Sequence, residues 1–340
     1  MILKVRVVPL IILILEAILR RLPKSHPRYP MIEDEHRRRV IGYKGEESLD
    51  FYYRSLPEQK YFILHDLNLP DGPYNCQIDT LLISSDSIIA VGSKNIGGNL
   101  TFDTENKQFI QEWHGEMKGY PSPIAQEERH QEYLQQLLAA HNFPPVPVDY
   151  VIVLSNPYAT YVVTGPESGR VKKRVCKADA FLNRIKMFEG YYKTPVLEAK
   201  EMRRLSRLLI KMNTPPTNFM LEKFGIEKSD LMPGVLCPTS HHPLIRKKHK
   251  WYCPACQTYS KDAHIHMLMD YFLLYDLKIT NKQFREFARL DCIHIAGRIL
   301  RSLNLISSGS KKTRTYSPAS FPWDPKKEIK NMSKKERSGN

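Results

Sequence analysis

The chain has 340 residues, of which 42% are hydrophobic and 26% are charged, and its formal net charge is +15. This length allows two or three domains, and the composition is that of an ordinary globular protein. The positive surplus favours a polyanionic partner, first nucleic acid and second an anionic membrane surface, over a merely basic protein. The six scattered cysteines argue against a disulfide framework, so a reducing cytoplasmic location is expected.

The N-terminal segment is predicted to form a helix that begins at Pro9 and ends near Leu22. Its apolar run over residues 7–15 follows two basic residues, as in a short signal peptide, but no small-residue cleavage site comes after it. Glu16 interrupts the run well before the ~20 apolar residues that a membrane-spanning helix needs. The helix is expected to dock on the body of the protein, with attachment of residues 7–22 to a membrane surface as the alternative.

Residues 1–40 therefore comprise this helix and a basic connector that contains three prolines. Residues 41–213 alternate helix-like and strand-like segments, which predicts an α/β domain. The predicted helices are 42–56, 122–141, 178–190 and 198–212, and the predicted strands are 61–67, 77–84, 88–95, 99–102 and 149–154.

Two neighbouring strands of this domain carry polar residues that suggest phosphodiester chemistry. Asp79 lies early on the first strand, and Lys94 lies at the end of the second. A phosphodiester-cleaving nuclease needs carboxylates to hold a divalent metal ion and gains from a lysine near the transition-state charge. Glu46, on the preceding helix, could add a carboxylate, and Gln126, on the following helix, could orient water or phosphate.

This arrangement resembles the nuclease-related domain (NERD) family, a branch of the PD-(D/E)xK nuclease superfamily. The resemblance covers roughly residues 40–155, and its longer layout is similar to versions from Bacillus-type bacteria with a basic N-terminal segment and a Cys-rich module. The motifs that carry it are Gly45-Glu46, Gln77-Ile78-Asp79, Lys94-Asn95 followed by Gly98, and Pro123-Ile124-Ala125-Gln126.

The resemblance implies a PD-(D/E)xK nuclease-like core, with a central mixed sheet flanked by helices, that acts on DNA with Mg²⁺ or Mn²⁺. Carried over by motif, the catalytic residues are Glu46, Asp79, Lys94 and Gln126, and the metal ligands are Asp79 and Glu46. One position departs from the family pattern, which places an acid two residues before the lysine as Glu-x-Lys. That position is Gly92 here, so one metal anchor is missing, and hydrolysis should be slow or absent without compensation.

Compensation for Gly92 could come from Glu46 or, more weakly, from Ser93 or Asp103. Glycine also weakens a buried strand, and the close approach of another backbone is one reason for its presence there.

Residues 234–262 are typical of a small zinc-ribbon-like module. Its second knuckle, Cys-Pro-Ala-Cys, is intact, whereas its first has Ser240 where a ribbon has a second cysteine. Zinc takes four Cys or His ligands, and a neighbouring histidine could supply the fourth. The predicted ligands of a structural Zn²⁺ ion are Cys237, His241, Cys253 and Cys256. The alternative is a metal-free hairpin held by Trp251 and Tyr252.

Residues 263–318 are predicted to form three helices and a basic wing, as in a winged helix-turn-helix, with residues 319–340 as a disordered basic tail. Thr280 and Asn281 give the second helix a good N-cap. An ordinary helical bundle with a solvated basic face is the alternative. The residues predicted to contact nucleic acid are Arg246, Lys247, Lys248, His294, Arg298, Arg301, Lys311, Lys312 and Arg314.

The sequence alone is compatible with three functions. The first is metal-dependent hydrolysis of DNA, and the second is DNA binding by a nuclease fold that has lost catalysis at Gly92. The third is a peripheral membrane adaptor that uses residues 7–22.

Overall fold

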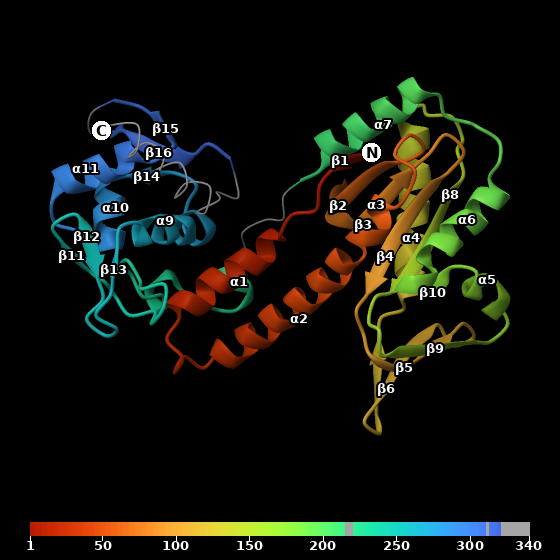
Figure 1. The fold of residues 1–340 in the computed structure, drawn as a ribbon, viewed down its shortest axis with the longest axis horizontal. Helices are drawn as coiled ribbons and strands as arrows, with labels where there is room; N and C mark the ends of the chain where they lie inside the picture. The colour runs from red at the N-terminus through yellow and green to blue at the C-terminus, as the bar shows by residue number, and fades with distance from the viewer. Residues whose placement is uncertain (215–219, 311–312, 321–340) are drawn as a thin grey trace. The chain divides into compact units, whose positions relative to one another are not determined.

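A computed structural model describes residues 1–214, 220–310 and 313–320. The chain divides into two compact units (Figure 1). Unit 1 consists of Met1–Val8 and Arg38–Pro216, and unit 2 consists of Pro9–Arg37 and Thr217–Asn340. The predicted tail from residue 321 onward and the predicted DNA contacts Lys311 and Lys312 lie outside the described residues.

Unit 1 is built on a six-stranded mixed sheet in the order β1-β2-β3-β4-β8-β10. The pairs β2 with β3 and β3 with β4 are antiparallel, whereas β1 with β2, β4 with β8, and β8 with β10 are parallel pairs. The strands are β1 (Ile2–Lys4), β2 (Phe62–Asp71), β3 (Tyr74–Ile83), β4 (Ile88–Lys94), β8 (Val148–Leu154) and β10 (Val175–Lys177).

Both faces of the sheet are covered, because successive residues of its central strands enter different cores. Ala90 of β4 packs with α4 (Pro123–Ala140) and α7 (Ala199–Met212). Val91 packs with α3 (Asp50–Arg54) and α6 (Phe181–Tyr191) on the other face. Coverage of both faces explains why every residue of β8 is buried and why the strand is apolar except for Asp149. The predicted α/β arrangement of a central mixed sheet between helices is confirmed.

A second sheet of unit 1 has four strands in the order β7-β6-β5-β9. Of these four strands the sequence predicted only β5, because Leu100 and Phe102 are the clearest apolar pair. Phe109 of β6 joins these two residues in the core. The strands are β5 (Gly98–Asp103), β6 (Gln108–Trp113), β7 (Glu116–Tyr120) and β9 (Ala159–Thr164), and α5 (Ser168–Lys172) follows them.

The predicted N-terminal helix is present as α1 (Leu10–Arg21), with Pro9 at its N-cap. It docks in the core of unit 2, where Leu15 and Ile18 are fully buried. The predicted connector is wrong beyond residue 28, because α2 (Tyr29–Ser48) is one continuous helix. The proline of this helix lies in the first turn. A backbone N–H at that position would make no hydrogen bond within the helix, so proline is tolerated there.

Unit 2 also contains a small sheet and a group of helices around one core. Within the described ranges, no helix is both long and apolar enough to cross a bilayer. Three strands in the order β14-β16-β15 form a further sheet beside the last helices. The elements are α8 (Met220–Lys223), β11 (Ile245–Lys247), β12 (Lys250–Tyr252), β13 (Tyr259–Ser260), α9 (Ala263–Leu274), β14 (Ile279–Thr280), α10 (Asn281–Ala288), α11 (Ile293–Ser302), β15 (Leu305–Ser308) and β16 (Thr315–Pro318).

Candidate active site and metal centre

Glu46 is positioned by the close packing of α2 against the ends of β4 and β8. A Cβ atom on the preceding residue, Gly45, would lie 2.5 Å from Asn95 Cβ and 2.7 Å from Ser155 Oγ. Only glycine permits this approach, which holds the last turns of α2 on the sheet. Asn95 also donates from Nδ2 to the carbonyl of Ile41 over 2.8 Å, which ties the same helix to the end of β4.

A buried arginine that the sequence reasoning missed binds the Glu46 carboxylate. Arg6 Nη1 donates to Glu46 Oε2 over 2.7 Å, and the Arg6 side chain is only 3% exposed. The same guanidinium pairs with Asp50 at 3.1 Å and with Asp66 at 3.3 Å. Its remaining nitrogen donates to Thr80 Oγ1 over 3.0 Å. One cation thus faces three carboxylates.

Asp79 lies where the antiparallel pairing of β3 and β4 ends. The last paired residues are Thr80 and Val91, and beyond them Asp79 Oδ2 accepts a hydrogen bond of 2.9 Å from the backbone N–H of Ser93. The carboxylate therefore projects into the gap between the two strands, beside the end of β4.

Lys94 and Gln126 are brought together as a pair. Lys94 Nζ donates to Gln126 Oε1 over 3.0 Å, from the end of β4 to the first turn of α4. Helix α4 begins there because Ser122 caps it, accepting from the N–H of Ala125, and Pro123 occupies its first position. The lysine amine is held by an uncharged partner and keeps its positive charge available.

The charges of Asp79 and Lys94 both act on the Glu46 carboxyl group. Burial raises the pKa of Glu46, and the negative charge of Asp79 raises it further. Arg6 and Lys94 act in the opposite sense and favour the carboxylate. A carboxyl group in this position gains from any added positive charge, as a metal ion would provide.

Gly92 is explained by a side chain, not by the backbone approach that the sequence suggested. A Cβ atom at Gly92 would lie 2.2 Å from Oε1 of Glu127, which follows Gln126 on α4. Asp103 and Ser93, the weaker candidates to replace the missing acid, make hydrogen bonds elsewhere. Asp103 caps a turn by accepting from the N–H groups of Glu105 and Asn106, and Ser93 Oγ donates to Ser155 Oγ.

The donor chemistry of this region fits a hard divalent cation. Carboxylate oxygens are the ligands that Mg²⁺ and Mn²⁺ favour, and Mg²⁺ commonly keeps several waters around one or two of them. Within the described ranges, no three carboxylates approach one another as closely as the cysteines of unit 2 do. Such an ion would therefore complete its coordination with water or phosphate oxygens.

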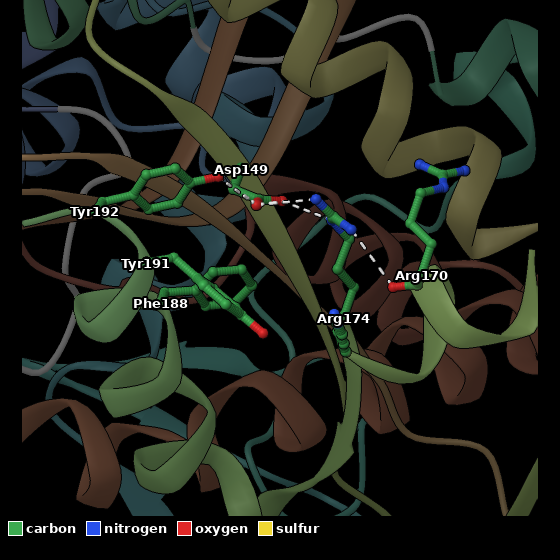
Figure 2. A pocket seen from close by; sticks show the side chains of 7 residues that line it. Asp149, Arg170, Arg174, Phe188, Tyr191 and Tyr192 are labelled. Atoms are coloured by element: carbon green, nitrogen blue, oxygen red, sulfur yellow. Dashed lines mark hydrogen bonds and ion pairs between the residues drawn. The ribbon is translucent and has the colours of Figure 1, made fainter.

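A separate pocket of unit 1 has about 350 Å³ of volume and a basic, aromatic lining. Figure 2 shows Arg174 and Tyr192 directed at the Asp149 carboxylate, which they bind over 2.7 and 2.8 Å. Arg170 is likewise paired, with Glu128 and Glu167. Asp149 lies early on β8, away from the end where Leu154 is paired with Lys94, so this pocket is distinct from the candidate site.

Unit 2 brings three predicted zinc ligands together. The sulfur atoms of Cys237, Cys253 and Cys256 all lie within 4.8 Å of one another. His241 is exposed, and the structure does not bring it into this group. Ser240 lies closer, with its Oγ 3.3 Å from the Cys253 sulfur.

The polarity around these cysteines favours thiolates, the form that binds metals. Burial acts to raise the pKa of Cys237, but hydrogen bonds from Ser240, Thr239 and Cys256 outweigh it and lower that pKa to about 6. The hydroxyl of Ser240 also lowers the pKa of Cys253. The three sulfurs therefore fit a Zn²⁺ ion in distance and in chemistry.

The predicted nucleic-acid contacts of unit 2 include Arg246 and Arg298, whose positive charges act on each other. Burial lowers the pKa of Arg246, and the positive charge of Arg298 lowers it further. Arg246 stacks over Trp251 with 4.9 Å between the guanidinium carbon and the ring centre. The other described members of the predicted set, Lys247, Lys248, His294, Arg298, Arg301 and Arg314, are exposed.

Comparison with known families identifies one domain of the chain. Residues 41–155 match the sequence profile of the nuclease-related domain (NERD). The chain thus contains a nuclease-related domain, and the match spans Glu46, Asp79, Lys94 and Gln126. No curated protein and no solved structure matches the chain.

Proposed function

We propose that this protein is a metal-dependent phosphodiesterase of the PD-(D/E)xK type that acts on DNA. The observation that carries the proposal is the grouping of an acid, an amine and an amide around the end of β4, inside the segment that matches the nuclease-related domain. Asp79 contacts the Ser93 amide, and Lys94 binds Gln126 over 3.0 Å.

Each residue has a defined part in this proposal. Asp79 and Glu46 would hold Mg²⁺ or Mn²⁺, an ion that polarises phosphate and lowers the pKa of a bound water when present. Lys94 stabilises the negative charge that develops on the phosphate oxygens. Gln126 fixes the lysine amine and can orient a water molecule with its amide.

Unit 2 supports DNA as the substrate in this proposal. Its helices α9, α10 and α11 and its sheet β14-β16-β15 have the order of a winged helix-turn-helix, in which the last helix enters the major groove. The exposed side of α11 carries His294, Arg298 and Arg301 at helical spacing. Adjacent like charges such as Arg246 and Arg298 are favourable beside phosphates, because the polyanion neutralises both.

The remaining assignments of this proposal follow the same chemistry. A structural Zn²⁺ ion on Cys237, Cys253 and Cys256 would hold the small sheet of unit 2. The cysteines are free thiols, which supports a reducing cytoplasmic location.

The test is a cleavage assay on the full chain. Purified protein is incubated with plasmid and with single-stranded DNA, with Mg²⁺ or Mn²⁺, beside an Asp79→Ala variant. Cleavage that requires the metal and disappears in the variant supports the proposal. Cleavage that survives Asp79→Ala would contradict the assignment of this site.

A second candidate function is DNA binding without cleavage, and Gly92 is the observation that favours it. The family pattern has an acid at this position, and glycine contributes no oxygen from a side chain. This function predicts gel shifts with both DNA forms and no metal-dependent products in the same incubations.

A further inference from the structure

The side-chain space beside Gly92 is filled by a carboxylate from another element. Oε1 and Cδ of Glu127 lie 2.2 and 2.8 Å from the position of a Cβ atom at Gly92. Cβ atoms in proteins essentially never lie so close to another heavy atom. A residue other than glycine at position 92 would therefore have to displace the Glu127 carboxylate.

The spacing of residues along β4 and α4 explains why the Glu127 carboxylate lies beside Gly92. Gly92 and Lys94 are two residues apart on a strand, so they share one face of the sheet. Gln126 and Glu127 are consecutive on α4, and they meet Lys94 and Gly92 respectively. The carboxylate therefore lies beside the position from which the Glu-x-Lys acid would extend, with Lys94 as the lysine of that motif.

The Glu127 side chain is buried in a way that favours an additional positive partner. The residue is 1% exposed, and within the described part of the chain its one hydrogen-bonding partner is His130 Nδ1, at 3.1 Å from Oε2. Buried carboxylates are normally paired or bound to a metal ion, because burying a bare charge is costly. Oε1, the atom beside Gly92, has no hydrogen-bond donor among the described residues.

We propose that Glu127 supplies from α4 the metal-binding carboxylate that Gly92 does not supply from β4. In this arrangement Glu127 and Asp79 both bind a divalent cation beside the end of β4, and Gly92 leaves room for the relocated acid. This inference rests on the proposed function, which it deepens by naming a further metal ligand.

The first test measures Mn²⁺ affinity by calorimetry on the full chain, with cleavage as a second readout. Glu127→Gln keeps the shape of the side chain and removes its charge. We expect it to weaken Mn²⁺ binding by about tenfold or more, since even outer-shell changes cost 10- to 100-fold. Glu132→Gln, on an exposed position of the same helix, is the matched control and should bind as the wild type does.

The second test moves the acid back to the strand. In Gly92→Glu alone, two carboxylates compete for one space, so Mn²⁺ affinity should not rise. In Gly92→Glu/Glu127→Ala, the space is free for the new side chain, and Mn²⁺ affinity should return to within a few-fold of the wild type. Thermal melting identifies a variant that fails to fold. In that case the comparison of Glu127→Gln with Glu132→Gln decides whether Glu127 binds the metal ion.

The outcomes separate this inference from the proposed function. Unchanged Mn²⁺ affinity in Glu127→Gln, together with a loss in Asp79→Ala, overturns the role of Glu127 and leaves the proposed function standing. Absence of Mn²⁺ binding to the wild type overturns both. A loss in Glu127→Gln that the relocated acid rescues supports the inference.

Discussion

The guanidinium of Arg6 and the carboxylate of Glu46 are joined over 2.7 Å, which links the first residues of the chain to the helix that carries a candidate metal ligand. Arg6→Ala leaves Glu46, Asp50 and Asp66 without their shared cation. Removing one partner of a buried ion pair costs about 3–5 kcal/mol, so we expect a loss of that order in the free energy of unfolding. Urea denaturation measures it.

The matched control for Arg6 is Arg37→Ala. Arg37 pairs with Asp34, but its side chain is 71% exposed. Exposed pairs contribute little, so this variant should unfold within about 0.5 kcal/mol of the wild type. Equal effects of the two substitutions would show that the Arg6 network is not a stabilising element.

Zinc content tests the cysteine group. We expect one zinc ion per chain in protein purified without chelator, and its loss in Cys253→Ser, because three sulfurs define the site. Elemental analysis measures the metal. Cys292→Ser, which changes an exposed cysteine outside the group, should keep its zinc. A metal-free wild type with an unchanged melting temperature would favour the hairpin held by packing alone.

The buried ring of His264 predicts a loss of stability in mild acid. Trp251 Nε1 donates to His264 Nδ1 over 3.2 Å, and burial, aided by the charge of Arg246 and opposed by Asp262, lowers the pKa of His264 to about 4. An unfolded histidine has a pKa of about 6.5, so the unfolded chain binds the proton first as the pH falls. This contribution to stability is complete above about pH 6.5 and is lost progressively down to about pH 4.

Denaturation at pH 7.5 and pH 5 measures this effect. Replacing His264 with Asn, which retains an acceptor but does not titrate, should reduce the difference in unfolding free energy between the two conditions by about 2 kcal/mol. His249→Asn, at an exposed position, should leave the difference as it is in the wild type. An unchanged difference in the His264 variant would contradict the prediction.

Salt dependence tests the basic surface of unit 2. If Arg298 contacts phosphate, Arg298→Ala should weaken DNA binding at low salt and reduce the slope of log affinity against log salt by about 1. Fluorescence anisotropy across a salt series gives that slope. Lys278→Ala removes an equal charge from an exposed position of the same unit outside the predicted contact set. Indistinguishable slopes for the two variants would argue against contact through α11.

The central strands and α4 were predictable because their signals are local. β8 is apolar except for Asp149, and α4 begins with a serine cap followed by proline. The helical part of the predicted connector was missed because its prolines suggested a loop. Pro30 lies in the first turn of α2, where proline is compatible with a helix.

The site was predictable only where it follows a motif. Arg6 was missed because its partners lie 40 to 74 positions away along the chain. Glu127 was missed because the motif directs attention to the strand position two residues before Lys94. A usable signal was present, since Glu127 directly follows Gln126 and precedes His130 by three residues, which places both side chains on one side of α4.

The division of the chain has a consequence for its synthesis. Residues 1–8 belong to one unit, residues 9–37 to the other, and the chain then returns to the first until residue 216. No single cut can release either unit with all of its segments. As the protein leaves the ribosome, α1 emerges long before α9, so the apolar side of α1 stays uncovered until its partners in the core have been made.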